Sequence, residues 1–257
     1  MGPAVGRRIM VIIPGFGHPD LGRKVEILQK NMSVLPEGTA YMILNHNANP
    51  EDIPNSLLND PRIAWKHGAG APAWSIHNHA VPEEIREAGY THVMILLDGM
   101  ELLNMVHPDQ LDLVMDRYKM DILSPTLLHA ESTHMIHNPN TPTLAIRSQT
   151  VVELFCYYMR IGTYDRYYRY IDPSNAWMWG MDLVLSEYLG FGMAVMNMWI
   201  VHDHSPSQNS PYNDAKEEQT MLYVGRYDPT LTMEGMSLIP RTISEVSVQE
   251  LLYISCA

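Results

Sequence analysis

Two carboxylates lie together where an apolar stretch of the sequence ends. Asp98 directly follows the run THVMILL at Thr91–Leu97, and Glu101 lies in the same turn, LLDGMEL. A divalent cation such as Mg²⁺ or Mn²⁺ prefers oxygen ligands, and opposite a diphosphate leaving group it keeps positions open for phosphate oxygens. The turn therefore predicts a metal site. The alternative is that Asp98 only caps the turn that follows it.

A second group combines tryptophans with a carboxylate in the segment NAWMWGMDL. Trp177 and Trp179 precede Gly180, and Asp182 stands where a helix is expected to begin. Aromatic faces stack on the C–H surfaces of sugar rings, and a nearby carboxylate accepts a proton from an attacking hydroxyl. We expect Asp182 to act as a general base beside an aromatic wall. In the alternative, both tryptophans belong to the core and Asp182 is a helix N-cap.

A third group, His202, Asp203 and His204, ends the apolar run Met193–Val201. Alternate residues of a strand point to the same side, so His202 and His204 could bind one metal ion together. A structural role for these histidines is the alternative. The string SIHNH resembles the HNH nuclease motif, but it is short and the acidic chain offers no basic surface for DNA.

The elements that must position these groups follow from hydrophobic periodicity. Strands are expected at Arg8–Ile13, Ala40–Leu44, Thr91–Leu97, Asp121–Ser124, Met193–Val201 and Met221–Val224, and helices at Leu21–Leu35, Pro82–Ala88, Leu111–Met115, Gln149–Met159 and Met181–Leu189. This alternation favours an α/β fold with a mostly parallel central sheet and helices on both faces.

Loops at the carboxyl ends of such strands are the places where ligands bind. The rule selects Gly15–Asp20, Asn45–Asp52, Asp98–Glu101, the segment around Ser124–His137, and His202–His204. The first of these loops, PGFGHPD, has neither GxGxxG nor a Lys-Ser/Thr pair. We therefore expect it to approach a nucleotide through its backbone.

Composition limits the classes of partner. The chain has 257 residues, a formal net charge of −12 and 46% hydrophobic residues, which indicates one globular domain with a sizeable core. The negative charge argues against a nucleic-acid surface. Two cysteines, and no signal peptide or membrane-spanning run, favour a reducing, cytoplasmic setting. The composition leaves open whether the protein forms a homodimer.

The order of these pieces resembles that of GT-A glycosyltransferases. That family has an N-terminal strand and loop, an acidic turn after a central strand, a WG-(D/E) segment near the acceptor, and a late His that completes the metal shell. In this chain the corresponding pieces are Ile9–Asp20, Asp98–Glu101, Trp179–Asp182, and His202 or His204. The strings THVMILLDGMEL, MDILSPTLL, NAWMWGMDL and NMWIVHDH are also similar, in their order, to those of a plant-abundant family of uncharacterised glycosyltransferase-like proteins. The acidic turn of the GT-A family has the pattern Asp-x-Asp, whereas the turn in this chain is Asp-Gly-Met-Glu.

The resemblance implies a GT-A-like (Rossmann-like) single domain, with a nucleotide-sugar-binding half at residues 1–110, an acceptor half at 111–204 and a C-terminal tail at 205–257. It implies transfer of a sugar from a nucleotide-sugar donor to a carbohydrate or other hydroxyl acceptor, with Mn²⁺ or Mg²⁺. The rivals are a metal-dependent hydrolase that uses His202, Asp203 and His204, and a non-catalytic sugar- or nucleotide-binding protein. The implied site residues are Asp182 as catalytic base; Asp98, Glu101, His202 and His204 for the metal; Pro14, Gly15, Phe16, Asn47, Asp52, Asp98 and Gly99 for the donor; and Trp177, Trp179 and Gly180 for the acceptor.

Overall fold

The computed structural model describes residues 7–128, 144–204, 213–232 and 242–247, with Gly235 and Gln249. The chain forms two compact units, and it contributes two segments to each. Unit 1 consists of Met1–Gly99 and Phe155–Met178, and unit 2 consists of Met100–Leu154 and Trp179–Ala257. The prediction of a single domain with three consecutive parts stays a prediction.

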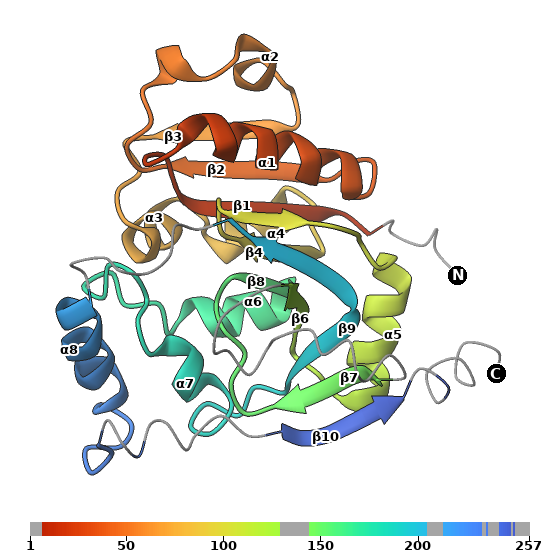
Figure 1. Ribbon diagram of the computed structural model, residues 1–257, viewed down its shortest axis with the longest axis vertical. Helices are drawn as coiled ribbons and strands as arrows, with labels where there is room; N and C mark the ends of the chain where they lie inside the picture. The colour runs from red at the N-terminus through yellow and green to blue at the C-terminus, as the bar shows by residue number, and fades with distance from the viewer. Residues whose placement is uncertain are drawn as a thin grey trace. The chain divides into compact units, whose positions relative to one another are not determined.

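Unit 1 contains a mostly parallel sheet (Figure 1). Its strands, in the order in which they pair, are β8 (Cys156–Arg160), β4 (His92–Leu96), β1 (Ile9–Phe16), β2 (Ala40–Asn45) and β3 (Ile63–His67). Every neighbouring pair is parallel except β4 and β8. Apart from Gly15, all residues of β1 are buried, as are all of β4, which is typical of parallel strands covered on both faces.

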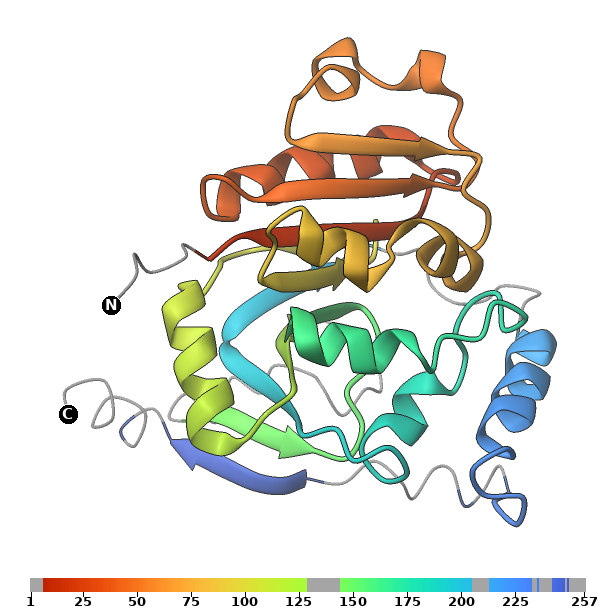
Figure 2. The ribbon, with the colours of Figure 1, turned by 180° about the vertical axis from the view of Figure 1, so that it is seen from behind.

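Helices cover both faces of this sheet. Opposite views show α1 (Leu21–Val34) on one face and α3 (Pro72–His79) and α4 (Pro82–Glu87) on the other (Figures 1 and 2). The first helix buries Val25, Leu28 and Met32, which share one helical face. Helix α6 (Ile161–Tyr168) packs against α4, and η1 (Pro50–Asp52) and α2 (Asn55–Leu58) lie between β2 and β3.

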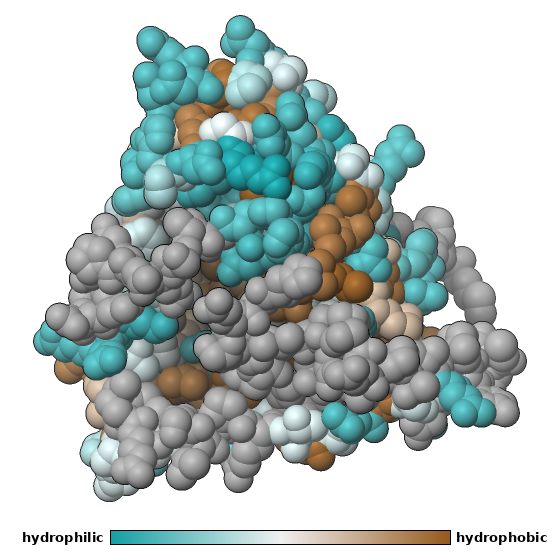
Figure 3. All heavy atoms as spheres, in the orientation of Figure 1, coloured by the Kyte–Doolittle hydropathy of each residue, from teal (hydrophilic) through white to brown (hydrophobic). Residues whose placement is uncertain are grey.

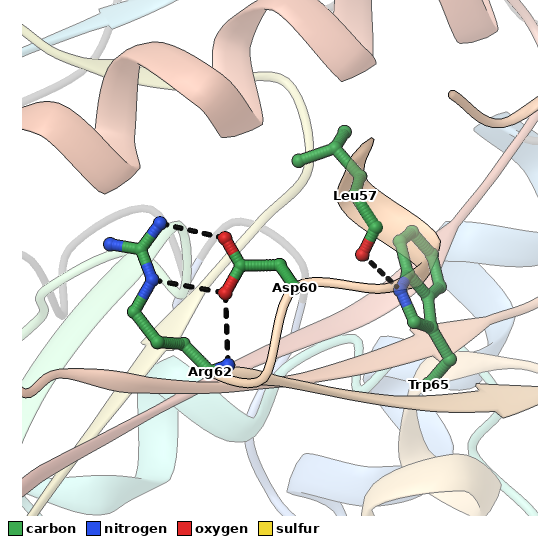
Figure 4. A network of polar contacts seen from close by, with 4 residues as sticks. All are labelled: Leu57, Asp60, Arg62 and Trp65. Atoms are coloured by element: carbon green, nitrogen blue, oxygen red, sulfur yellow. Dashed lines mark hydrogen bonds and ion pairs between the residues drawn. The ribbon is translucent and has the colours of Figure 1, made fainter. Parts of the chain in front are cut away.

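The turn before β3 is braced by two polar contacts (Figure 4). Both carboxylate oxygens of Asp60 accept hydrogen bonds from the Arg62 guanidinium, at 3.0 and 2.8 Å. These bonds hold the pKa of Asp60 below its usual value. Trp65 donates its indole N–H to the Leu57 carbonyl at 3.1 Å. The sequence interpretation missed β3, because its residues are mostly exposed or half-buried and show little hydrophobic periodicity.

Unit 2 is built around the long strand β9 (Met193–Asp203). This strand pairs in parallel with β6 (Ile122–Leu128) and antiparallel with β5 (Met100–Leu102) and β7 (Leu144–Gln149), and β10 (Thr242–Ser247) pairs antiparallel with β7. The part of this unit that the structure describes includes the helices α5 (Pro108–Tyr118), α7 (Met181–Leu185) and α8 (Asn213–Val224). The mixed α/β class with a mostly parallel, curled sheet is therefore confirmed.

Two of the predicted elements are wrong. Gln149–Met159 was expected as a helix, yet residues from Cys156 onward form β8, where Cys156, Tyr157, Tyr158 and Met159 are all buried. Aromatic residues favour strands, and β4 offers a pairing partner that sequence periodicity does not reveal. Met221–Val224 was expected as a strand, but it is the last turn of α8. Among the described residues, no helix combines the length and apolar composition needed to cross a bilayer.

Candidate functional site

A bulge in β9 determines where its last side chains lie. In the pairing with β6, Pro125 is opposite Met196 and Thr126 is opposite Ile200, so residues 197–199 of β9 have no counterpart. Asn104 binds this bulge on both sides. Its amide group donates to the Met198 carbonyl at 2.7 Å and accepts from the Ile200 N–H at 2.8 Å. Bulges of this kind commonly re-aim side chains next to functional sites.

Beyond the bulge, β9 pairs with β5 and brings three metal-ligating side chains together. Glu101 is directly opposite His202, and opposite residues of an antiparallel pair share a face. His204 is two residues further on and lies on the same face. The ligand atoms of Glu101, His202 and His204 all lie within 4.8 Å of one another, and His204 Nε2 is 2.6 Å from Glu101 Oε2. We call this group the triad.

The triad has a donor set suited to a divalent ion. It offers one carboxylate and two imidazoles, a combination that binds Zn²⁺, Fe²⁺ or Mn²⁺. Its Glu101 and His204 side chains are only 12% and 17% exposed, so solvent competes weakly with a ligand. Asp203 is opposite Met100, and the alternation of strand residues directs it to the other face. The carboxylate that lies beside the two histidines is therefore Glu101 of the acidic turn, not Asp203.

Asp98 lies in unit 1 and has partners that the sequence did not indicate. Its Oδ2 atom is 2.7 Å from Lys24 Nζ and accepts the Gly17 N–H at 3.3 Å. Burial raises the pKa of Asp98, and the charge and hydrogen bond of Lys24 oppose that rise. Of the four predicted metal ligands, the structure brings Glu101, His202 and His204 together in unit 2, and a metal role for Asp98 stays a prediction.

We expect Lys24→Met to destabilise the protein by about 2–4 kcal/mol at pH 8, because it leaves the Asp98 carboxylate buried without a counter-charge. The destabilisation caused by Lys24→Met should become smaller toward pH 4. The pKa of Asp98 is raised, so its carboxylate takes up a proton in the folded state there and no longer needs a counter-charge. Urea denaturation at both pH values measures this. Lys30→Met, on the exposed side of the same helix, is the control and should change stability by less than about 0.5 kcal/mol. Equal losses in the two variants would contradict the pairing.

The predicted donor residues gather mainly at the carboxyl ends of β1 and β2. Gly17 has φ 154, and a Cβ there would lie 2.0 Å from Asn47 Oδ1; that oxygen also accepts the His18 N–H at 2.8 Å. A Cβ on Gly15 would lie 3.1 Å from Pro72. Only glycine allows this close packing of the first loop. Among the other predicted donor residues, Pro14 is buried in β1, Phe16 is buried and ends β1, Asp52 is exposed in η1 and Gly99 follows Asp98.

Asp182 lies in the first turn of α7, and its surroundings differ from those of an N-cap. The N-cap is Gly180, with φ 79. The pKa of Asp182 is raised to about 7, chiefly by burial and also by the negative charge of Glu153, while backbone hydrogen bonds and Lys216 act in the opposite direction. A carboxyl group that titrates near neutral pH is well suited to accept a proton from a hydroxyl.

Helix α8 lies against the predicted acceptor segment of unit 2. A Cβ on Gly180 would be 3.0 Å from Thr220 and 3.1 Å from Val224, so only glycine permits this contact at a positive φ. Lys216 Nζ lies 4.9 Å from the centroid of the half-buried Trp179 ring. Trp177 belongs to unit 1 and is 40% exposed. Neither tryptophan is a fully buried core residue.

Sequence reasoning missed four partners of these sites, namely Lys24, Asn104, Glu153 and Lys216. Each is distant in the chain from the residue that it serves, and none belongs to a recognisable motif. They come close to the site residues only through the register of the paired strands and the packing of the helices.

We expect Asn104→Ala to weaken binding of Mn²⁺ by roughly tenfold, because residues that orient metal ligands typically contribute that much. Loss of two hydrogen bonds to the bulge should also lower stability by about 1–2 kcal/mol. Metal titration followed by electron paramagnetic resonance, together with thermal denaturation, tests both expectations. Asn59→Ala, which removes a side-chain bond to the Asn55 carbonyl, is the control for stability alone. Unchanged Mn²⁺ affinity in Asn104→Ala would contradict the positioning role.

Comparison with solved protein structures identifies the fold of this chain. No family model and no curated protein sequence matches the chain. The crystal structure of GalNAc-T7 with UDP, GalNAc and Mn²⁺ is similar at a TM-score of 0.60 and 10% identity, over 88% of this chain and 48% of that one. S. aureus TarS 1–349 is similar at a TM-score of 0.53 and 11% identity, over 90% and 74%.

These neighbours are GT-A glycosyltransferases, and at such low identity the likeness shows the fold alone. The chain spans about half of the GalNAc-T7 chain. The comparisons give no support to the closer likeness to a plant-abundant family.

Proposed function

We propose that this protein is a glycosyltransferase that moves a hexosyl or pentosyl group from a nucleotide-diphosphate donor to a hydroxyl acceptor. The observation that carries the proposal is the triad of Glu101, His202 and His204 on a fold of the GT-A type. A protein with that fold, GalNAc-T7, was crystallised with UDP, GalNAc and Mn²⁺, which supports a nucleotide-sugar donor and Mn²⁺ or Mg²⁺ here.

On the donor side, Glu101, His202 and His204 would hold the ion. When bound, the ion would stabilise the negative charge that develops on the diphosphate leaving group. In this proposal Asp98, three residues before Glu101 in the chain, contributes a further carboxylate. The loop residues Pro14, Gly15, Phe16, Asn47, Asp52 and Gly99 contact the nucleotide sugar; Phe16, being buried, does so through its backbone.

On the acceptor side, Asp182 removes the proton from the attacking hydroxyl. Its raised pKa supports this role, because a carboxylate with a pKa near 7 is a stronger base than an ordinary one. Direct attack assisted by such a base inverts the anomeric carbon. In a retaining reaction Asp182 would orient the acceptor instead. Trp177, Trp179 and Gly180 form the proposed surface for the acceptor sugar.

The proposal is tested by a thermal-shift panel of nucleoside diphosphates with and without Mn²⁺. A ligand that binds only the folded state raises the melting temperature by mass action. We expect at least one nucleoside diphosphate to stabilise the protein, and more strongly with Mn²⁺. Hydrolysis of the matching nucleotide sugar should then be measurable. Absence of any nucleotide-dependent shift would overturn the proposal.

The donor set of the triad also favours a second candidate, a metal-dependent hydrolase. Two histidines and one glutamate are a known ligand set of catalytic zinc. The hydrolase would purify with tightly bound Zn²⁺, whereas the transferase would bind Mn²⁺ weakly and mainly together with the nucleotide. Metal analysis of the purified protein separates the two. A protein that binds a nucleotide sugar but transfers it to no acceptor would be a non-catalytic binding protein.

A further inference from the structure

Two exposed tryptophans of unit 1 lie close together at the carboxyl edge of its sheet. Trp74 is in the first turn of α3, which follows β3, and Trp177 is near the end of the second segment of the unit. Ala73 donates its N–H to the Ala176 carbonyl at 3.0 Å. Because each tryptophan directly follows one of these two residues, covalent geometry places their Cα atoms within about 10 Å. The side chains are 46% and 40% exposed.

Each indole ring is held in place by neighbours. A Cβ added to Gly70 would lie 3.2 Å from Trp74 Cε3, so that ring rests on the Gly70 backbone. His79 meets Trp74 edge to face, with ring centroids 6.1 Å apart. His46 meets Trp177 in the same way, also at 6.1 Å. Rings that are fixed and still exposed lose little side-chain entropy when a flat ligand stacks on them.

The neighbouring polar groups suit a ligand with hydroxyls. The Nδ1 atom of His46 is buried and makes no hydrogen bond to any described residue; turning the imidazole toward the exposed side would let this atom bond a ligand hydroxyl. The segments that surround the two tryptophans, residues 45–49, 68–79 and 171–178, contain no Lys or Arg, and the chain has a net charge of −12. These segments therefore supply no positively charged side chain that would bind an anionic ligand directly.

We propose that Trp74 and Trp177, with His46 and His79, form a platform for a neutral hexopyranose unit of an oligosaccharide acceptor. The C–H face of the sugar stacks on the exposed indoles, and its hydroxyls face the imidazoles. The platform adds Trp74, His46 and His79 to the acceptor residues, and it makes the acceptor a chain of sugars rather than a small aglycone. This inference rests on the proposed function, which takes the acceptor to be a carbohydrate.

The test uses the full chain and defined oligosaccharides. Neutral probes are cellopentaose, maltopentaose, chitopentaose and mannopentaose, and acidic probes are pentagalacturonate and a sialic acid oligomer. Binding is followed by intrinsic tryptophan fluorescence and by isothermal titration calorimetry. We expect at least one neutral probe to bind and the acidic probes not to bind. Trp74→Ala and Trp177→Ala should each weaken binding by about 5- to 10-fold, and Trp74→Phe should retain most of it.

Leu222→Ala is the matched control, because Leu222 is 63% exposed on α8 in unit 2, and it should bind like the wild type. Binding of no neutral probe, preference for acidic probes, or equal affinity in wild type and Trp74→Ala would each overturn the platform. Nucleoside diphosphate binding with Mn²⁺ is measured on the same variants and should be unchanged. If the protein binds a nucleotide but no oligosaccharide, the platform is rejected and the proposed transferase function stands. If it binds an oligosaccharide but no nucleotide, the transferase function is rejected and the platform stands.

Discussion

Replacing Asp182 with Asn should lower the rate of sugar transfer by about 10²–10⁴-fold, the usual contribution of a positioned general base. The fold should survive, since Asn has the shape of Asp and the N-cap of α7 is Gly180. Single-turnover transfer from the nucleotide sugar identified by thermal shift is the measurement. Asp109→Asn is the matched control, because Asp109 also lies in the first turn of a helix, α5, and is exposed. Unchanged turnover in Asp182→Asn would remove Asp182 from the mechanism.

The pH dependence of the wild type follows from the same group. The pKa of Asp182 is about 7 because burial raises it, Glu153 adds to the rise, and Lys216 opposes it. Transfer needs the deprotonated form, so the rate should increase as pH rises through about 7 and level off above. Lys216→Met should move this midpoint upward, because it removes a positive charge that favours the carboxylate.

Stability should change with pH in the opposite sense. Between the ordinary Asp pKa of 3.8 and about 7, the folded protein binds a proton at Asp182 that the unfolded chain does not. The contribution of Asp182 to folding stability is therefore lost as pH rises from about 4 to about 7. The Asp182→Asn variant does not lose this stability. The difference in melting temperature between the variant and the wild type should therefore increase in favour of the variant from about pH 4 to about pH 7 and stay constant above.

The second large effect concerns the triad. Glu101→Gln or His204→Ala should reduce Mn²⁺ affinity by at least about 100-fold and abolish metal-dependent transfer, because each removes one ligand of the triad. Calorimetric titration with MnCl₂ measures the first effect, and a transfer assay with added Mn²⁺ measures the second. Thermal denaturation without metal should show a folded protein in both variants.

Asp203→Asn provides the control for the triad within the same strand. Asp203 is adjacent to both histidines in sequence, but it is opposite Met100 and points away from them. Its substitution should leave Mn²⁺ affinity within about twofold of the wild type. Loss of metal binding in Asp203→Asn together with normal binding in Glu101→Gln would show that the strand faces are assigned the wrong way round.

How far the sequence predicts this molecule depends on whether a feature is local. The buried run of β1, the helical spacing of Val25, Leu28 and Met32, and the apolar run before Asp98 are local, and they predict their elements correctly. The strand β8 is not recognisable in this way, because its apolar residues become a strand only through pairing with β4. The parallel arrangement followed from the alternation of elements, not from any one of them.

The candidate site shows the same division. Spacing in a strand indicates that His202 and His204 share a face, and the structure agrees. That Glu101 joins them depends on the register of β5 against β9, and hence on the bulge at residues 197–199 and its contact with Asn104. The partnership of Lys24 with Asp98 likewise depends on where α1 crosses the sheet. Such distances between remote residues follow from the complete fold and from no local pattern.

The two-segment composition of each unit has a consequence for synthesis. The sheet of unit 1 needs β8, which follows β5, α5, β6 and β7 of unit 2 in the chain. On the ribosome, the exposed edge of β4 must therefore wait for roughly sixty further residues, several seconds at ordinary elongation rates. During that interval an open strand edge is available for wrong pairing. A rearranged chain in which Phe155–Met178 directly follows Gly99 through a linker should shorten this interval and raise the soluble yield on expression.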